Sequence, residues 1–158
     1  MTGQPFFLTM AGISLSLAGF AGLLASFRDA SQPWTTTDLW RLRRIVNRSF
    51  ASVFVALIPI PIYGILGDEA VAVRIASVVF AAVVFIDLVI LTPEWRRLWP
   101  GDRSLYVAWV ISGSMGLLLV ANVALASAGV YELGLVLILL WPAGIFMRVL
   151  RSVRAQTE

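Results

Sequence analysis

Asp87 is the charged residue of an otherwise apolar run, residues 83–92, which reads VVFIDLVILT. A carboxylate in hydrocarbon is costly if it is ionised and unpaired, so its position requires either a partner or a function. The structural interpretation is an ion pair with Arg44, Arg48 or Arg148, which we place at a similar depth. The functional interpretation is a carboxylate that faces a pore, where it would attract cations or carry protons. In a homo-oligomer the Asp87 carboxylates of the copies would form a ring of acidic groups.

Arg74, Asn122 and Trp141 are the other polar candidates inside apolar runs. Arg74 either extends its side chain to lipid headgroups and Asp68, or acts as the outer selectivity charge of an anion pathway. Asn122 and Trp141 are expected at the depth of Pro59, where their N–H groups need acceptors. In the structural interpretation, these groups and the carbonyls of the kinked helices satisfy each other's hydrogen bonds. In the functional interpretation, they form a small polar site in the membrane, as broken helices do in transporters.

Three prolines supply such acceptors. Pro59 and Pro61 are predicted to break the second apolar run, and Pro142 the fifth. Each proline removes a backbone donor and frees a carbonyl one turn earlier, for example at Val55 and Ile138.

The residue inventory excludes much of enzyme chemistry. The chain has no cysteine and no histidine, and its 12 basic residues are all arginine. Thiolate and Schiff-base chemistry, imidazole bases and the usual metal ligands are therefore missing, and no catalytic sequence motif is present. We expect no enzymatic activity, no catalytic residues, no metal and no cofactor. An intramembrane enzyme would have to work with Asp87, arginines and hydroxyl groups alone.

The composition predicts an all-α integral membrane protein of one domain, residues 1–158. Hydrophobic residues make up 59% and charged residues 13% of the 158 residues, and a small soluble domain cannot bury so much apolar surface. A spanning helix needs about 20 apolar residues. Five runs fit, and the predicted spans are approximately residues 5–27, 47–67, 70–92, 105–130 and 132–150. Pro93 is expected to close the third span.

The charges between these runs predict the orientation. Basic and non-basic connections alternate along the chain, as five spans require under the positive-inside rule. The amino terminus is expected outside and the carboxyl terminus in the cytoplasm. The opening GISLSLAGFAGLLASF is typical of small bacterial inner-membrane proteins, so we predict a multi-pass protein of that membrane. The net charge of +3 is attributed to this asymmetry, and no nucleic-acid partner is expected.

The segment TTTDLWRLRRIVNRSF is predicted to form an amphipathic helix between spans 1 and 2. Thr35 and Asp38 have capping-box spacing, which places a helix start there. The helix either lies on the inner leaflet or forms the start of the second span. Its arginines are predicted to contact anionic lipid headgroups, with a protein-binding helix as the alternative; they are Arg41, Arg43, Arg44 and Arg48.

Small residues at helical spacing predict helix contacts. One stripe lies in the first span (Ser14, Ala18 and Gly22) and the other in the fourth (Ala108, Ser112 and Gly116). Such stripes let helix backbones approach closely, either within one chain or between copies. Since five spans enclose little interior, we expect a homo-oligomer. The order of a small-residue span and a proline-containing span recurs in the two halves, which is compatible with a remnant inverted repeat.

Two functions remain open. The first is a homo-oligomeric ion channel or small-solute pathway, on the basis of Asp87, the broken spans and the lack of an extramembrane domain. The second is a non-conducting membrane subunit or effector that docks a soluble partner on its cytoplasmic arginine-rich loops. The ion or solute, its selectivity and the gating stimulus do not follow from the sequence.

Overall fold

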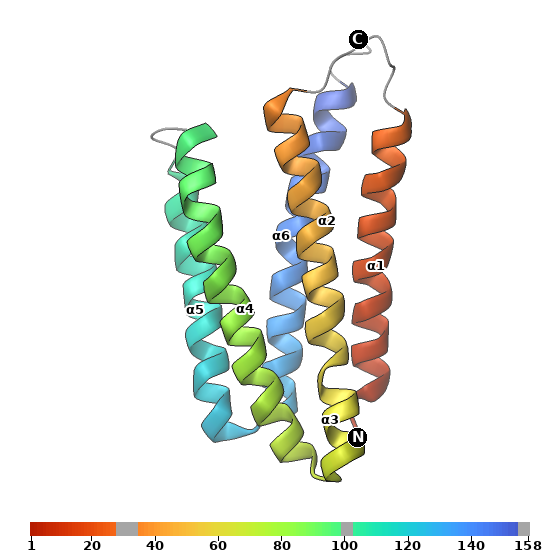
Figure 1. Ribbon diagram of the computed structural model, residues 1–158, viewed down its shortest axis with the longest axis vertical. Helices are drawn as coiled ribbons and strands as arrows, with labels where there is room; N and C mark the ends of the chain where they lie inside the picture. The colour runs from red at the N-terminus through yellow and green to blue at the C-terminus, as the bar shows by residue number, and fades with distance from the viewer. Residues whose placement is uncertain (28–34, 99–102, 155–158) are drawn as a thin grey trace.

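The computed structural model describes residues 1–27, 35–98 and 103–154, and these ranges form helices joined by short connections. The long helices run alternately up and down the bundle, and α3 continues in the direction of α2 (Figure 1). In chain order they are α1 (Gln4–Phe27), α2 (Thr36–Leu57), α3 (Pro59–Leu66), α4 (Glu69–Leu98), α5 (Ser104–Leu125) and α6 (Ala128–Arg154).

Five of the helical segments are long and apolar enough to cross a membrane. They are Gln4–Ser26, Thr36–Leu66, Glu69–Leu98, Tyr106–Leu125 and Ala128–Met147. Their outward faces carry large apolar side chains, and Ile65, Val89 and Val110 are 82%, 68% and 68% exposed. Apolar faces of this kind suit lipid and not water. The prediction of an all-α chain with five helices of spanning length is therefore confirmed, and it indicates a multi-pass membrane protein.

The helix ends at one end of the bundle carry most of the arginines of the described residues. We call one end the basic end, where α2 and α5 begin and α4 stops; its arginines include Arg41, Arg43, Arg96, Arg97 and Arg103. At the acidic end α4 and α6 begin, with Asp68, Glu69 and Glu132. This separation agrees with the alternation on which the predicted orientation rests, and the assignment of the basic end to the cytoplasm remains a prediction.

The second span starts where the capping-box spacing predicts. The Thr35 hydroxyl accepts a hydrogen bond from the Asp38 backbone N–H at 3.1 Å and donates to the Asp38 carboxylate at 2.7 Å. From Thr36 the helix continues without interruption to Leu57. The arginine-rich segment is thus the first half of the second span, which was the second of the two alternatives, and no separate helix lies between α1 and α2 in the described residues.

Proline interrupts one span and leaves two others continuous. α2 ends at Leu57 and α3 begins at Pro59, so the predicted break in the second span is present. Pro142 lies inside α6, and Pro93, which was expected to close the third span, lies inside α4. The predictions for these two positions are wrong. A proline removes a single backbone hydrogen bond, and packed neighbouring helices hold the rest of the helix together.

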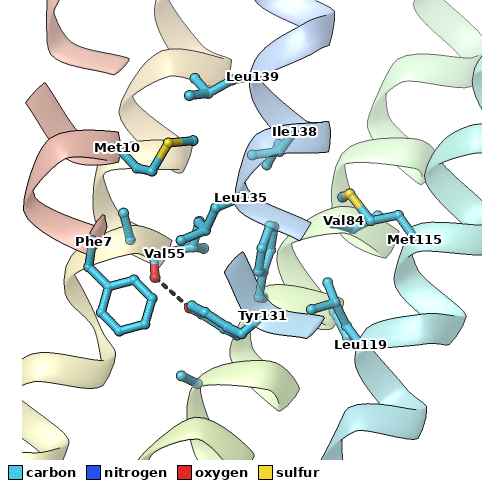
Figure 2. Close-up of a cluster of buried hydrophobic side chains, with 14 of the residues drawn as sticks. Phe7, Met10, Val55, Val84, Met115, Leu119, Tyr131, Leu135, Ile138 and Leu139 are labelled. Atoms are coloured by element: carbon cyan, nitrogen blue, oxygen red, sulfur yellow. Dashed lines mark hydrogen bonds between the residues drawn. The ribbon is translucent and has the colours of Figure 1, made fainter. Parts of the chain in front are cut away.

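A buried aromatic group fills the half of the bundle near the acidic end (Figure 2). Tyr131 packs edge-on against Phe7 and Phe80, with ring centroids 5.7 and 5.5 Å apart, and all three side chains are buried. The Tyr131 hydroxyl donates a hydrogen bond of 2.5 Å to the backbone carbonyl of Val55. That carbonyl is the one whose helical donor is missing because residue 59 is proline. The carbonyl freed by Pro59 therefore has a donor, from a different helix.

Small residues support contacts within the chain. Ser14 and Ala18 are buried in α1, which packs chiefly on α2, and Ala108, Ser112 and Gly116 are buried in α5, which packs chiefly on α4. Gly22 is exposed, with nothing near the position of a Cβ. Five of the six predicted packing residues thus face the inside of one protomer.

Two glycines differ in how freely their neighbours can move. A Cβ on Gly116 would lie 2.7 Å from the tip of Phe85, a ring that is 36% exposed. A Cβ on Gly134 would lie 3.2 Å from Phe80 and 3.3 Å from Leu119, which are both fully buried. The Phe85 ring can turn toward lipid, whereas Phe80 and Leu119 have no free space to enter.

We therefore expect Gly134→Ala to lower the free energy of unfolding by about 1 kcal/mol through overpacking. Gly116→Ala should lower it by less, although its nearest neighbour is closer. Gly144→Ala, on the same helix as Gly134 and with nothing within 4 Å, is the matched control and should be neutral. Unfolding in mixed detergent micelles, followed by circular dichroism, measures all three. A larger loss at Gly116 than at Gly134 would contradict the interpretation.

Candidate functional site

Asp87 is held by two arginines that project from α2 toward α4. Arg44 donates from Nη2 to both carboxylate oxygens of Asp87, at 2.8 and 2.9 Å. Nη2 of Arg48 lies 2.5 Å from Oδ2 of the same carboxylate. Residues four apart share one face of a helix, which is why both guanidinium groups reach the same acid. We call Arg44, Arg48 and Asp87 the arginine–aspartate cluster.

The cluster is buried and carries surplus positive charge. Arg44 and Arg48 are 4% and 3% exposed, and the side chain of Asp87 is 19% exposed. Asp87 lies about 27 Å along α4 from Glu69, at about 1.5 Å per residue, and so belongs to the half of the span nearer the basic end. With two guanidinium groups and one carboxylate, the formal charge of the cluster is positive. Burying an uncompensated charge costs several kcal/mol, which favours an additional anion.

A series of three packed indole rings begins at Arg44 of the cluster. Trp40 packs edge-on against Trp95 at 5.5 Å, and Trp95 packs at a tilt against Trp141 at 5.7 Å. The Arg44 guanidinium carbon lies 5.8 Å from the centre of the Trp40 ring, within the range of a cation–π contact. Trp40 also donates its indole N–H to the Glu94 carboxylate at 3.0 Å. The contact with the Trp40 ring stabilises the Arg44 guanidinium group beside Asp87.

A pocket adjoins the cluster on the side of α5 and α6. Its volume is about 200 Å³, and it is lined by Arg48, Ile111, Ser112, Met115, Leu137, Ile138, Leu140 and Trp141. Most of these side chains are apolar. The pocket therefore joins a hydrophobic space to one of the two guanidinium groups.

Four buried donors have no acceptor among the described residues, and two of them belong to residues that line the pocket, Arg48 and Trp141. The four donors are Nε of Arg44, Nε of Arg48, the hydroxyl of Ser49 and Nε1 of Trp141. Buried polar groups are normally hydrogen-bonded, so an orphaned set of this kind marks a place where a ligand can bind.

Of the other predicted site residues, Trp141 lines the pocket beside the cluster, whereas Asn122 and Arg74 lie apart from it. Asn122 is buried and caps the turn between α5 and α6: its amide donates to the Ser77 hydroxyl and to the Ser127 carbonyl, and its oxygen accepts from the Ser127 N–H, each at 3.0 Å. The predicted contact of Asn122 with a proline-freed carbonyl is not seen. Arg74 is exposed, and its two alternatives both remain.

The four arginines expected at lipid headgroups divide into two pairs. Arg43 is exposed, and Arg41 is half-buried, 3.8 Å from Asp38. Arg44 and Arg48 instead lie inside the bundle with Asp87, because they occupy the face of α2 that packs on its neighbours. The side chain of Arg148, the third partner considered for Asp87, lies outside the described side chains.

Trp95, Glu94 and Tyr131 are the site and core residues that were not predicted. Trp95 and Glu94 follow Pro93, where the third span was expected to stop, and only the continuation of α4 brings them to the cluster. For Tyr131 a signal was present, because the Val55 carbonyl was expected to lack its donor and a buried tyrosine hydroxyl needs an acceptor.

The described residues contain no group of three or more His, Cys, Asp or Glu that could hold a metal ion. What the cluster can do chemically is bind an anion or an acceptor oxygen. Because both oxygens of Asp87 already accept hydrogen bonds from arginine, attraction of cations is the weaker of its possible roles.

No protein-family model matches the chain, and no curated protein or solved structure matches it significantly.

Proposed function

We propose that this protein is a non-enzymatic, multi-pass protein of the bacterial inner membrane that provides a pathway for small anions. The observation that carries the proposal is the surplus guanidinium group of the arginine–aspartate cluster, buried in the half of the bundle nearer the basic end. A fixed positive charge inside a membrane protein attracts anions and repels cations, as the arginine and lysine rings of anion pores do.

The pathway is proposed to run between several identical copies of the chain. Within one protomer, Phe7, Phe80 and Tyr131 pack together, fully buried, in the half of the bundle near the acidic end, so we place the pathway outside this core. Copies packed side by side would place several clusters around a shared path, and anionic lipids would contact Arg41 and Arg43 at its cytoplasmic mouth.

Chloride flux from proteoliposomes tests the proposal, with potassium flux as the comparison. Arg48→Gln removes the surplus charge and leaves the bidentate Arg44–Asp87 pair, so the fold is expected to persist. We expect chloride flux to fall about tenfold or more, because one charge-assisted hydrogen bond to the anion is lost. Arg97→Gln, at an exposed arginine outside the cluster, is the matched control and should retain flux.

Potassium flux that exceeds chloride flux would overturn the anion assignment. An assembled wild-type protein that conducts neither ion would overturn the pathway. A homo-oligomer in nanodiscs supports the shared path, whereas a monomer contradicts it.

The second candidate is a non-conducting membrane subunit that docks a soluble partner at the basic end. The observation in its favour is that the cluster joins α2 to α4 and so also has a purely structural explanation. Exposed Arg43, Arg96 and Arg97 at the same end offer a basic surface. A soluble protein that co-purifies in fixed stoichiometry, and is lost on Arg96→Ala/Arg97→Ala, supports this candidate; a pure homomer contradicts it.

A further inference from the structure

The pocket between α5 and α6 opens on the lipid-facing side of the bundle. Two of its lining residues, Ile111 and Leu140, are 50% and 62% exposed. These apolar residues form the rim of the pocket on the outward faces of α5 and α6, where lipid is expected. A ligand therefore reaches the pocket from the hydrocarbon of the membrane.

The inner end of the pocket has two orphaned donors. Arg48 and Trp141 both line it, and Nε of Arg48 and Nε1 of Trp141 have no acceptor among the described residues. The Arg48 side chain is nearly fully buried and belongs to a cluster with one carboxylate for two guanidinium groups. The missing acceptor is thus an oxygen, and the surplus charge favours a carboxylate over a neutral carbonyl.

The size and depth of the pocket narrow the ligand class. An apolar cavity of about 150 Å³ holds one benzene molecule, so a pocket of about 200 Å³ takes one ring or a short alkyl chain. Phospholipid headgroups stay in the interfacial layer, whereas Arg48 lies about 18 Å along α2 from Thr36. An apolar carboxylic acid can enter the hydrocarbon in its neutral form, which a phospholipid headgroup cannot do.

We propose that this pocket binds an apolar carboxylic acid, with its carboxylate on Arg48 and Trp141 and its apolar part among the side chains of α5 and α6. This proposal rests on the proposed function for the anionic character of the site. It adds that the bound anion carries an apolar group. The acid comes either from fatty acids of the membrane or from dissolved aromatic acids, which share this chemistry.

Binding is measured by calorimetry on the protein in nanodiscs, with the heat of partition into empty nanodiscs subtracted. Octanoate represents the fatty acids and benzoate the aromatic acids; octanol and benzyl alcohol are the neutral controls. We expect at least one acid to bind saturably, about tenfold or more tightly than its alcohol, because the alcohol lacks the charge-assisted hydrogen bonds. The acid that binds identifies the source.

Two variants test the two ends of the pocket. Arg48→Gln should weaken binding of the acid about tenfold or more and leave the alcohol unchanged. Ser112→Phe places a ring in the pocket and should abolish binding of both, and the unfolding transition of each variant shows whether it is folded. Equal affinity for acid and alcohol, no saturation above empty nanodiscs, or full acid binding by folded Arg48→Gln would overturn the proposal.

The flux and binding measurements can overturn the two proposals independently of each other. Saturable acid binding without chloride flux leaves the pocket assignment standing and overturns the anion pathway. Chloride flux that depends on Arg48, without acid binding, supports the anion pathway and overturns the pocket assignment.

Discussion

Replacement of Asp87 by alanine is expected to lower the free energy of unfolding by about 3–5 kcal/mol, the largest effect of any single substitution that we predict. The carboxylate accepts hydrogen bonds from Arg44 and forms an ion pair with Arg48, and both arginine side chains are buried. Without it, two positive charges remain close together in the bundle with no counter-ion. Unfolding by sodium dodecyl sulfate in mixed micelles, followed by circular dichroism, measures the loss.

Two comparisons separate this charge effect from a simple loss of packing. Arg48→Gln should cost less than Asp87→Ala, since the Arg44–Asp87 pair that remains is neutral overall. The triple variant Arg44→Met/Arg48→Met/Asp87→Leu removes every charge of the cluster and should recover much of the stability, because apolar replacements of buried ion pairs are often neutral or stabilising. If Asp87→Ala unfolds like the wild-type protein, the cluster is not buried in the membrane-embedded molecule.

Tyr131→Phe is expected to lower the free energy of unfolding by about 1–3 kcal/mol, because it leaves the buried Val55 carbonyl without a donor. The ring contacts with Phe7 and Phe80 remain in this variant, so the loss reports the hydroxyl group. Tyr106→Phe is the matched control: the Tyr106 side chain is 68% exposed, and its loss of a hydroxyl should leave stability unchanged.

A double-mutant cycle with Pro59 tests the cause of this effect. Pro59→Ala returns the backbone N–H that normally donates to the carbonyl four residues earlier, which here is that of Val55. In that background the effect of Tyr131→Phe should shrink by at least about 0.5 kcal/mol, since the carbonyl then has its helical donor. Equal losses in both backgrounds would show that the tyrosine does not compensate for the proline.

The five spans and the separation of charge toward the two ends followed from the sequence, because hydropathy and charge act along a stretch of about 20 residues and need no knowledge of its neighbours. The start of the second span at Thr35 also followed from a local pattern, the capping-box spacing of Thr35 and Asp38. The free carbonyl of Val55 followed from Pro59, because proline has no backbone N–H. The absence of histidine, cysteine and lysine likewise limited the available chemistry before any fold was known.

Which groups meet across the bundle was decided by helix packing. The depth of Asp87 made Arg44, Arg48 and Arg148 candidate partners, and the rotation of α2 against α4 brings Arg44 and Arg48 to Asp87. That packing also kept α4 and α6 helical through Pro93 and Pro142 and turned Tyr131 toward Val55. The rotation and tilt of a helix in lipid depend on the shapes of the neighbouring helices, and its own hydropathy contains no such information. The pocket beside Arg48 exists only through this arrangement, since its walls come from α5 and α6 and from α2, which is distant from them in the sequence.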